Sequence, residues 1–378
     1  MRILVASDQW FPEYAGGAAR FATELAAQLT GAGHDVRAIV PRGTQEHLPV
    51  RNTATIPRTR LPATLVDPAA TFATALALRR EAFDVVLAHQ VTTAYGCAHA
   101  LRHTPLVLVY HASAPREARL HAADTTGTRR LTGDVLARVL ARLEHGAVAA
   151  ASAIVPLSDY SRGLVEGDYP SARSKVHALA GAVDTTHFRP AEPDQLLSPP
   201  LLLIVRRLEA GLGVEQALEA VALLARDAPL EVKFAGWGRD ARSLQERSAD
   251  LGLDGTVTFL GKVSSADLVK WYRRSHVVLI PPAPHEGFGL AALEALACAR
   301  PAVGTGGALP QLLGNLDKAL VAEDDSPSAL ADAVRKAFRL ASDDAFRRRC
   351  RDYAVDNFGW ATATRDWDAL LSRVAGGG

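Results

Sequence analysis

The chain has 378 residues, which exceeds the size at which a single hydrophobic core usually stops growing, so two domains are expected. Its composition, 48% hydrophobic and 22% charged, is typical of a folded globular protein and excludes disordered and collagen-like classes. The formal net charge of +1 provides no overall attraction to nucleic acid or an anionic membrane, which favours a small-molecule ligand.

In the first half, short apolar runs bounded by turn residues alternate with stretches of helical period, a pattern typical of a parallel sheet with crossover helices. The predicted strands are residues 3–6, 36–40, 85–88, 106–110, 154–157 and 176–179. The clearest helix carries Phe21, Leu25 and Leu29 on one stripe and stops at the glycines of residues 31–33. The apolar run after Met1 is too short for a signal peptide and indicates the first strand.

A proline-rich segment at residues 189–200 interrupts the alternation, and we expect the interdomain linker there. This predicts a first domain over residues 1–188 and a second over 189–378. In the second domain the predicted strands are residues 201–205, 232–235, 257–260, 277–281, 302–304 and 320–321. Helices follow residue 344; we expect the last to pack back on the first domain, with Trp360 and Trp367 as packing residues.

The expected fold is therefore α/β, with two Rossmann-like, doubly wound parallel-sheet domains. Open parallel sheets bind ligands at the carboxyl ends of their strands, so two in series are expected to face each other across a cleft. Three cysteines lie far apart without CxxC spacing, namely Cys97, Cys298 and Cys350. They favour reduced thiols and a cytoplasmic protein. No apolar stretch is long enough to predict a membrane-spanning helix.

The most informative stretch, residues 281–297, reads PPAPHEGFGLAALEALA and predicts a strand end, a turn, a glycine pair and an apolar helix. The free N–H groups and dipole at a helix start attract anions, and glycines allow a phosphate to approach the backbone. Glu286 precedes this helix, and Glu294 lies about 7 Å further along its axis. A nucleotide sugar fits this spacing, with the hexose at Glu286, the diphosphate at the helix start and the ribose at Glu294. Alone, Glu294 would more often occupy an exposed helix face.

These residues resemble the retaining glycosyltransferases of family four, which have the GT-B fold of two facing Rossmann-like domains. The family signature is two glutamates separated by seven residues, here Glu286 and Glu294, in a Glu-Gly-Phe-Gly-Leu loop. Weaker features follow in the family's order along nearly the whole chain. These are a glycine-rich loop at residues 11–17, His111 after a strand, an Asn-Gly-Val-Asp-like turn at 181–184 and a Gly-x-Gly loop at 236–238.

The resemblance implies a metal-independent hexosyltransferase that uses a nucleoside diphosphate sugar, most often a UDP-sugar, and retains the anomeric configuration. It implies no metal and no cofactor beyond this co-substrate. The catalytic residues that it implies are Glu286, Arg207 and His111. The donor-binding residues that it implies are Glu294, Phe288, Gly289, Leu290, Arg207, Gly16, Gly17 and Gly236, and we add the neighbouring Arg206 to this set.

The chain also departs from the family pattern. After the first strand of the second domain the family has an arginine and a lysine that neutralise the donor diphosphate; here Arg207 keeps the arginine position, but Leu212 occupies the lysine position. Arg206 is an extra arginine that could substitute for the lysine. A later Gly-Gly-x-Pro-Glu motif is altered at residues 307–311.

Three alternatives remain open. An NAD-dependent oxidoreductase is favoured only by a weak GxGxxA match at residues 236–241. Leu212 at the lysine position leaves a second alternative open, an epimerase or a non-catalytic protein with an altered donor site. A lipid-acceptor enzyme at the membrane surface is suggested by a basic helix over residues 129–143, although Asp134 and Glu144 favour an ordinary surface helix.

The acceptor is the least defined partner. The loop at residues 111–117 carries charges of both signs, which favours a polar acceptor such as a cyclitol, aminocyclitol or sugar. Nucleic acid is not expected as a partner. The alanine- and arginine-rich composition is typical of a high-GC, actinobacterial genome, where antibiotic biosynthesis is a natural setting. His89 also ends a predicted strand, and we favour a structural role for it over a role in binding. The pairs 324–325 and 343–344 are expected to cap helices rather than bind a cation.

Overall fold

The computed structural model describes residues 1–12, 14, 16–41, 50, 53–56, 63–123, 128–192, 196, 198–209, 211–283 and 286–377. Glu13 and Ala15 of the glycine-rich loop, Ala210, His285, parts of the expected linker and the side chains of residues 129–132 lie outside this description. The chain forms two compact units, one of Met1–Gly181 with Trp360–Gly378 and one of Ala182–Gly359.

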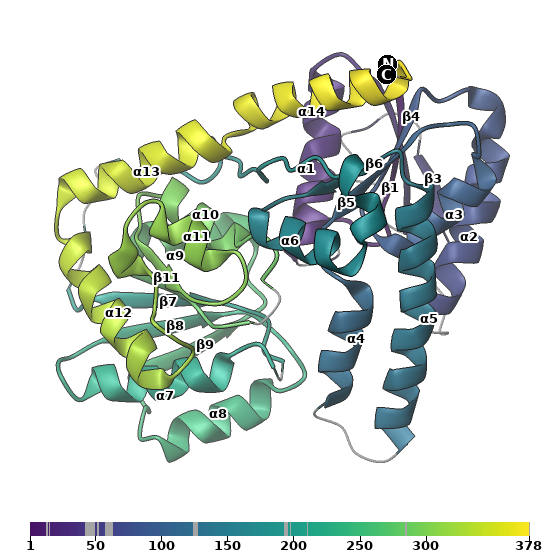
Figure 1. Cartoon of the computed structure of the whole chain (residues 1–378). Helices are drawn as coiled ribbons and strands as arrows, with labels where there is room; N and C mark the ends of the chain where they lie inside the picture. The colour runs from purple at the N-terminus through teal and green to yellow at the C-terminus, as the bar shows by residue number, and fades with distance from the viewer. Residues whose placement is uncertain are drawn as a thin grey trace. The chain divides into compact units, whose positions relative to one another are not determined.

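The described part of the first unit contains a six-stranded sheet, all of whose neighbouring pairs are parallel, in the order β3-β2-β1-β4-β5-β6. Figure 1 labels β1, β3, β4, β5 and β6 of this sheet. Its strands are β1 (Arg2–Ala6), β2 (Asp35–Pro41), β3 (Thr53–Ile56), β4 (Val85–Ala88), β5 (Leu106–Tyr110) and β6 (Ala153–Pro156). The chain builds one side of the sheet from β1 and then the other from β4. The strand order thus reverses between β1 and β4, where doubly wound sheets bind ligands.

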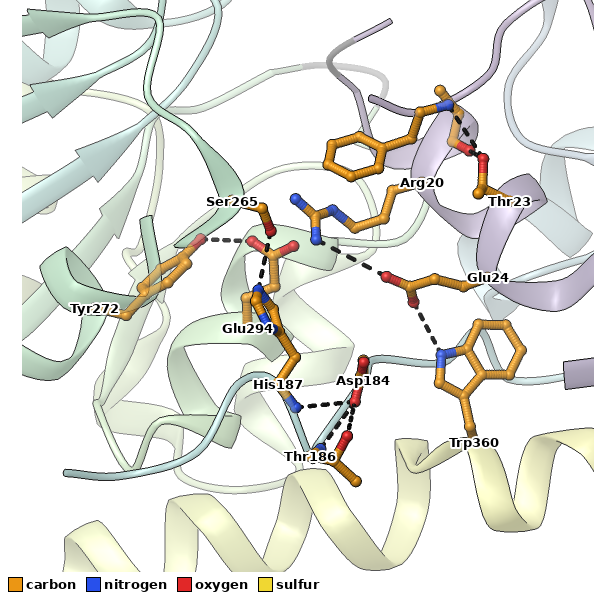
Figure 2. Close-up of polar contacts among 12 residues, drawn as sticks. Arg20, Thr23, Glu24, Asp184, Thr186, His187, Ser265, Tyr272, Glu294 and Trp360 are labelled. Atoms are coloured by element: carbon orange, nitrogen blue, oxygen red, sulfur yellow. Dashed lines mark hydrogen bonds and ion pairs between the residues drawn. The ribbon is translucent and has the colours of Figure 1, made fainter. Parts of the chain in front are cut away.

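Helix α1 packs on this sheet through an apolar stripe on which Phe21, Leu25 and Leu29 are buried. The helices of the first unit are α1 (Gly17–Gly31), α2 (Ala63–Leu78), α3 (Val91–Ala100), α4 (Ala114–Ala123), α5 (Thr128–Ala150), α6 (Asp159–Asp168) and α14 (Trp360–Ala375). The C-terminal helix α14 joins this unit beside α1, where Trp360 Nε1 donates a hydrogen bond to Glu24 (2.9 Å; Figure 2). Trp360 and Trp367 are buried, as expected of packing residues.

The second unit contains, in its described part, a five-stranded parallel sheet in the order β11-β10-β7-β8-β9. Its strands are β7 (Leu201–Val205), β8 (Glu231–Ala235), β9 (Val257–Gly261), β10 (Val277–Ile280) and β11 (Ala302–Gly304). Its helices are α7 (Val214–Ala225), α8 (Ala241–Asp250), α9 (Ser265–Arg274), α10 (Leu290–Ala297), α11 (Leu309–Gly314), α12 (Pro327–Ala341) and α13 (Asp344–Phe358). Here the order reverses between β7 and β10, so a ligand is expected at the carboxyl ends of these two strands.

Two predicted strands are absent from the described structure. Residues 176–179 form no strand and only a single bridge joins Val176 to Ile154. Residues Lys318–Leu320 form a 3-10 turn, after which Val321 makes one bridge to Gly304. Both segments lie beside the sheet: His177 N and Leu179 N donate to Ile154 O and Pro156 O of β6, and Ala322 N donates to Gly304 O, but each segment forms only one bridge.

The first unit also ends earlier than residue 188. Residues from Ala182 onward belong to the second unit because Val183 and Phe188 are buried in its hydrophobic core. Asp343 caps α13 by accepting from Ala345 N, and Asp324 accepts from the backbone of Ser326, the cap of α12. No described helix combines the length with the apolar character that crossing a bilayer requires.

Candidate active site

Arg206 and Glu286 meet where the strand order of the second unit reverses. Arg206 directly follows β7, and Glu286 lies in the loop after β10. Arg206 Nη1 donates to Glu286 Oε2 at 2.5 Å, and the other carboxylate oxygen accepts from the backbone N–H of Gly289 at 3.1 Å. Both side chains are less than one-fifth exposed, so this is a charged cluster with restricted access to water.

The start of α10 faces the same cluster through Gly289. This residue caps the helix with a φ of 83°, and a Cβ there would lie 2.8 Å from Leu309 Cδ2, so glycine is required. The intrahelical bonds begin with Ala292 N and Leu293 N, both donating to Gly289 O. The N–H groups of Leu290 and Ala291 precede these bonds and, with the helix dipole, form an anion-attracting end beside Arg206.

Neighbouring loops fix both charged residues through close backbone contacts. A Cβ on Gly236 would lie 1.7 Å from Arg206 O, and one on Gly307 would lie 2.2 Å from Glu286 O. Ala308 N also donates to Glu286 O at 2.8 Å. The loops after β8 and β11 therefore hold the backbones of Arg206 and Glu286, which explains the glycines at these positions.

Arg207 takes a different position from Arg206. Its guanidinium pairs with Glu209 at 3.2 Å, and its side chain is 52% exposed. Arg206, by contrast, also reaches the loop that carries Leu212, whose carbonyl accepts from Arg206 Nε at 3.4 Å. The cation that contacts Glu286 is thus the extra arginine, next to the position where the family has lysine.

Glu294 is buried rather than on an exposed helix face, with only 4% of the residue accessible. Tyr272 of α9 donates its hydroxyl to Glu294 Oε2 at 2.8 Å (Figure 2). Phe288 packs its ring near that of Phe358, with the centroids 6.4 Å apart, and so belongs to the core that supports this loop. The structure thus places a second carboxylate on α10, the helix that starts at Gly289.

In the first unit, His111 follows β5 and lies beside His89, which follows β4. His89 Nδ1 and His111 Nε2 are 3.1 Å apart, and both rings contact the edge of Phe21. Burial lowers the pKa of His111 to about 4 and the pKa of His89 well below its usual range. Both imidazoles are therefore neutral near pH 7. Gly16 and Gly17 form the start of α1, where the first N–H groups of that helix point outward.

Asp8 is a further candidate residue, which the sequence analysis missed. It follows β1 at the reversal point of the first sheet, accepts from Thr92 Oγ1 at 2.7 Å, and donates its backbone N–H to Gln90 Oε1. Burial raises the pKa of Asp8 to about 6. Its Oδ1 and His89 Nε2 are buried without a hydrogen-bond partner among the described residues. The available signal was its position directly after the first strand.

Residues 133–143 of α5 keep an exposed face that includes Asp134, Arg138 and Arg142, but Glu144, which the sequence analysis took as support for a surface helix, does not lie on it. Glu144 is fully buried and anchors the loop after His111, accepting from Ser113 Oγ (3.2 Å), from Ala114 N (2.9 Å) and from two tyrosine hydroxyls, those of Tyr110 and Tyr169. Burial raises its pKa, and these donors partly offset that effect. This part of α5 therefore supports the His111 loop.

Two family models divide the chain between them. The model described as "Glycosyltransferase Family 4" matches residues 15–187, and "Glycosyl transferases group 1" matches residues 188–356. The chain belongs to glycosyltransferase family four. This confirms the resemblance drawn from Glu286 and Glu294.

Curated relatives of this family-four protein include an enzyme of Saccharomonospora viridis and one of Mycobacterium tuberculosis. A D-inositol 3-phosphate glycosyltransferase of Saccharomonospora viridis is 31% identical over 71% of this chain, a match that spans 63% of the relative's length. A GDP-mannose-dependent alpha-(1-6)-phosphatidylinositol dimannoside mannosyltransferase of Mycobacterium tuberculosis is 28% identical over 99% of this chain and 97% of its own.

Solved structures agree on the fold. Sucrose-phosphate synthase of Thermosynechococcus elongatus matches with a TM-score of 0.81 and 17% identity over all of both chains. Anabaena HepE in complex with UDP and glucose matches with a TM-score of 0.73 and 16% identity, over 98% of this chain and 99% of its own. The family-four protein therefore has the GT-B fold, with two Rossmann-like domains on one chain.

Proposed function

We propose that this protein is a retaining, metal-independent hexosyltransferase that takes its sugar from a nucleoside diphosphate donor. The observation that carries the proposal is the cluster of Arg206, Glu286 and the α10 start at the reversal point of the second sheet. A diphosphate needs cations and N–H donors, and a hexose needs hydrogen-bond acceptors; this cluster offers both within one charged network.

Each group has a specific role in the donor complex. The N–H groups of Leu290 and Ala291 and the Arg206 guanidinium bind the diphosphate, and the helix dipole adds to this attraction. The Glu286 carboxylate, already held by Gly289 N, accepts from hexose hydroxyls. Glu294 accepts from the ribose hydroxyls, in the role that the family signature gives it.

The chemistry is a front-face substitution at the anomeric carbon. The bond from that carbon to the diphosphate oxygen breaks, a bond to the acceptor oxygen forms on the same face, and the acceptor proton passes to the departing diphosphate. Arg206 and the α10 N–H groups stabilise the negative charge that develops on the leaving group. Arg206 thereby compensates for Leu212 at the lysine position.

The first unit supplies the acceptor groups. His111 is neutral near pH 7, so its ring can accept a hydrogen bond from a hydroxyl or donate one to it. Asp8 has a buried carboxylate oxygen without a partner among the described residues. The N–H groups of Gly16 and Gly17 at the start of α1 suit an electronegative substituent. These groups favour a polar acceptor.

A cyclitol or sugar is the acceptor class that we propose, since one relative is named for D-inositol 3-phosphate and another for a phosphatidylinositol mannoside. The HepE complex contains UDP, which supports UDP as the first donor nucleotide to test. The three buried free thiols support a cytoplasmic location. We propose actinobacterial secondary metabolism as the setting of the reaction. Leu212 keeps a non-catalytic or epimerase role as the second candidate.

The test is nucleotide release from a panel of UDP-, GDP-, ADP- and TDP-sugars mixed with inositols, aminocyclitols and simple sugars, in the presence of a metal chelator. We expect release from one donor only when a suitable acceptor is present, and NMR of the product should show the donor's anomeric configuration. An inverted product or dependence on added metal would overturn the proposed mechanism. Conversion of the donor sugar without an acceptor would favour the epimerase.

A further inference from the structure

Trp237 is the most exposed tryptophan of the chain. It lies in the loop after β8, one strand away from Arg206, and 68% of the residue is accessible. Trp10, Trp360 and Trp367 are buried, and Trp271 is half-buried with Arg274 above its ring. An indole left in water at a ligand-binding edge forgoes a large burial energy, so a role in binding accounts for it best.

The backbone that carries this indole is held tightly on both sides. Leu208 N donates to Trp237 O at 3.2 Å, which ties the loop to the end of β7, and Gly236 N donates to Gly261 O at 3.1 Å, which ties it to β9. A Cβ on Gly238 would lie 2.0 Å from Leu208 O, so the loop contacts its neighbour without space for a side chain. An exposed ring on an anchored loop is a preorganised binding surface rather than a mobile tip.

The position of Trp237 matches the length of the donor. Strands β10, β7 and β8 are consecutive neighbours in the sheet, so the end of β8 lies about 10 Å from the end of β10. A diphosphate at the α10 start leaves its ribose and base to extend away from the Arg206 cluster. The indole face presents a flat apolar surface at this carboxyl edge, and every nucleobase has a π-face that stacks on such a surface.

We propose that Trp237 is the stacking platform for the nucleobase of the donor and thus a residue that determines nucleotide affinity. This inference rests on the proposed function, because it requires a nucleoside diphosphate at the α10 start. It adds a contact that depends on the base alone, and a ligand that lacks the base should not detect it.

The experiment measures the binding of UDP, GDP and inorganic pyrophosphate to wild type, Trp237→Ala and Trp237→Phe by calorimetry. We expect Trp237→Ala to weaken nucleoside diphosphate binding by about 5- to 150-fold and to leave pyrophosphate binding unchanged. Trp237→Phe should retain most of the affinity because it keeps an aromatic face. The matched control is Val135→Ala on α5, an apolar side chain that is also exposed, at 57%, and this variant should bind as the wild type does.

Unchanged nucleotide affinity in Trp237→Ala would overturn the inference, as would an equal loss of pyrophosphate binding, which would show that the loop itself had shifted. A loss in Trp237→Phe as large as in Trp237→Ala would also overturn it. If the wild type bound pyrophosphate and no nucleoside diphosphate, the proposed function would fail together with this inference. Nucleotide binding by the wild type with no effect of Trp237→Ala would overturn the inference alone.

Discussion

Replacing Arg206 by glutamine tests which arginine acts on the donor diphosphate. Arg206 is 14% exposed and bonded to Glu286, whereas Arg207 is 52% exposed and bonded to Glu209. A hydrogen bond to a charged group contributes about 1.5–3 kcal/mol, so Arg206→Gln should weaken diphosphate binding and lower kcat/KM by about 10- to 150-fold. Arg207→Gln removes only an exposed pair of about 0–1 kcal/mol and should change either quantity by no more than about fivefold.

The assay is a calorimetric titration of the preferred nucleoside diphosphate, with kcat/KM from nucleotide release and thermal unfolding as a check on the fold. Arg206→Lys should show an intermediate effect because it keeps the charge but loses the planar fork that can bind two oxygens. A larger loss in Arg207→Gln than in Arg206→Gln, with both variants folded, would refute the assignment of Arg206.

Three further outcomes follow from the structure. Gly307→Ala should lower the free energy of unfolding by about 1–3 kcal/mol, since its Cβ would lie 2.2 Å from Glu286 O. Gly163→Ala on α6 has open space around it and should be neutral or stabilising. Equal effects of the two substitutions in chemical denaturation would contradict this prediction. Burial raises the pKa of Asp8 from 3.8 to about 6, so its contribution to stability is complete below about pH 4 and is lost as the pH rises through 6, by up to roughly 3 kcal/mol. Asp8→Asn should therefore flatten the pH dependence of stability between pH 4 and 7, and a curve parallel to that of the wild type would count against it. His111, whose pKa burial lowers to about 4, should show no titration in NMR spectra between pH 6 and 8, and a midpoint in that interval would show that the ring is more solvated than the structure indicates.

Periodicity predicted most of the strands because parallel strands are buried on both faces and form continuous apolar runs. Residues 106–110 and 201–205 became β5 and β7 with the predicted bounds. The same signal failed at residues 176–179, since an apolar run beside an edge strand can bond to that strand, as His177 N and Leu179 N do to β6, without completing a ladder. Strand β3 was missed because Thr53–Ile56 is short and only weakly apolar.

The placement of Glu286 before α10 and of Glu294 within it was predictable, because the glycines and the apolar run mark where the helix begins. It was not predictable where side-chain direction decides: Arg206 and Arg207 are adjacent, and only the structure shows that Arg206 contacts Glu286. Glu144 was expected at a surface because burial of a carboxylate depends on distant donors such as Tyr169. Asp8 was missed because its setting depends on the pairing of β1 with β4.

The central claim is that a nucleoside diphosphate lies along α10 with its ribose on Glu294, and the binding of the preferred diphosphate to Glu294→Ala tests it most directly. Tyr272→Phe is the control, because it removes the hydroxyl that donates to Glu294 but leaves the carboxylate in place. We predict a loss of at least about tenfold in Glu294→Ala and a much smaller loss in Tyr272→Phe. Unchanged affinity in Glu294→Ala, or the same loss in both variants, would contradict the account.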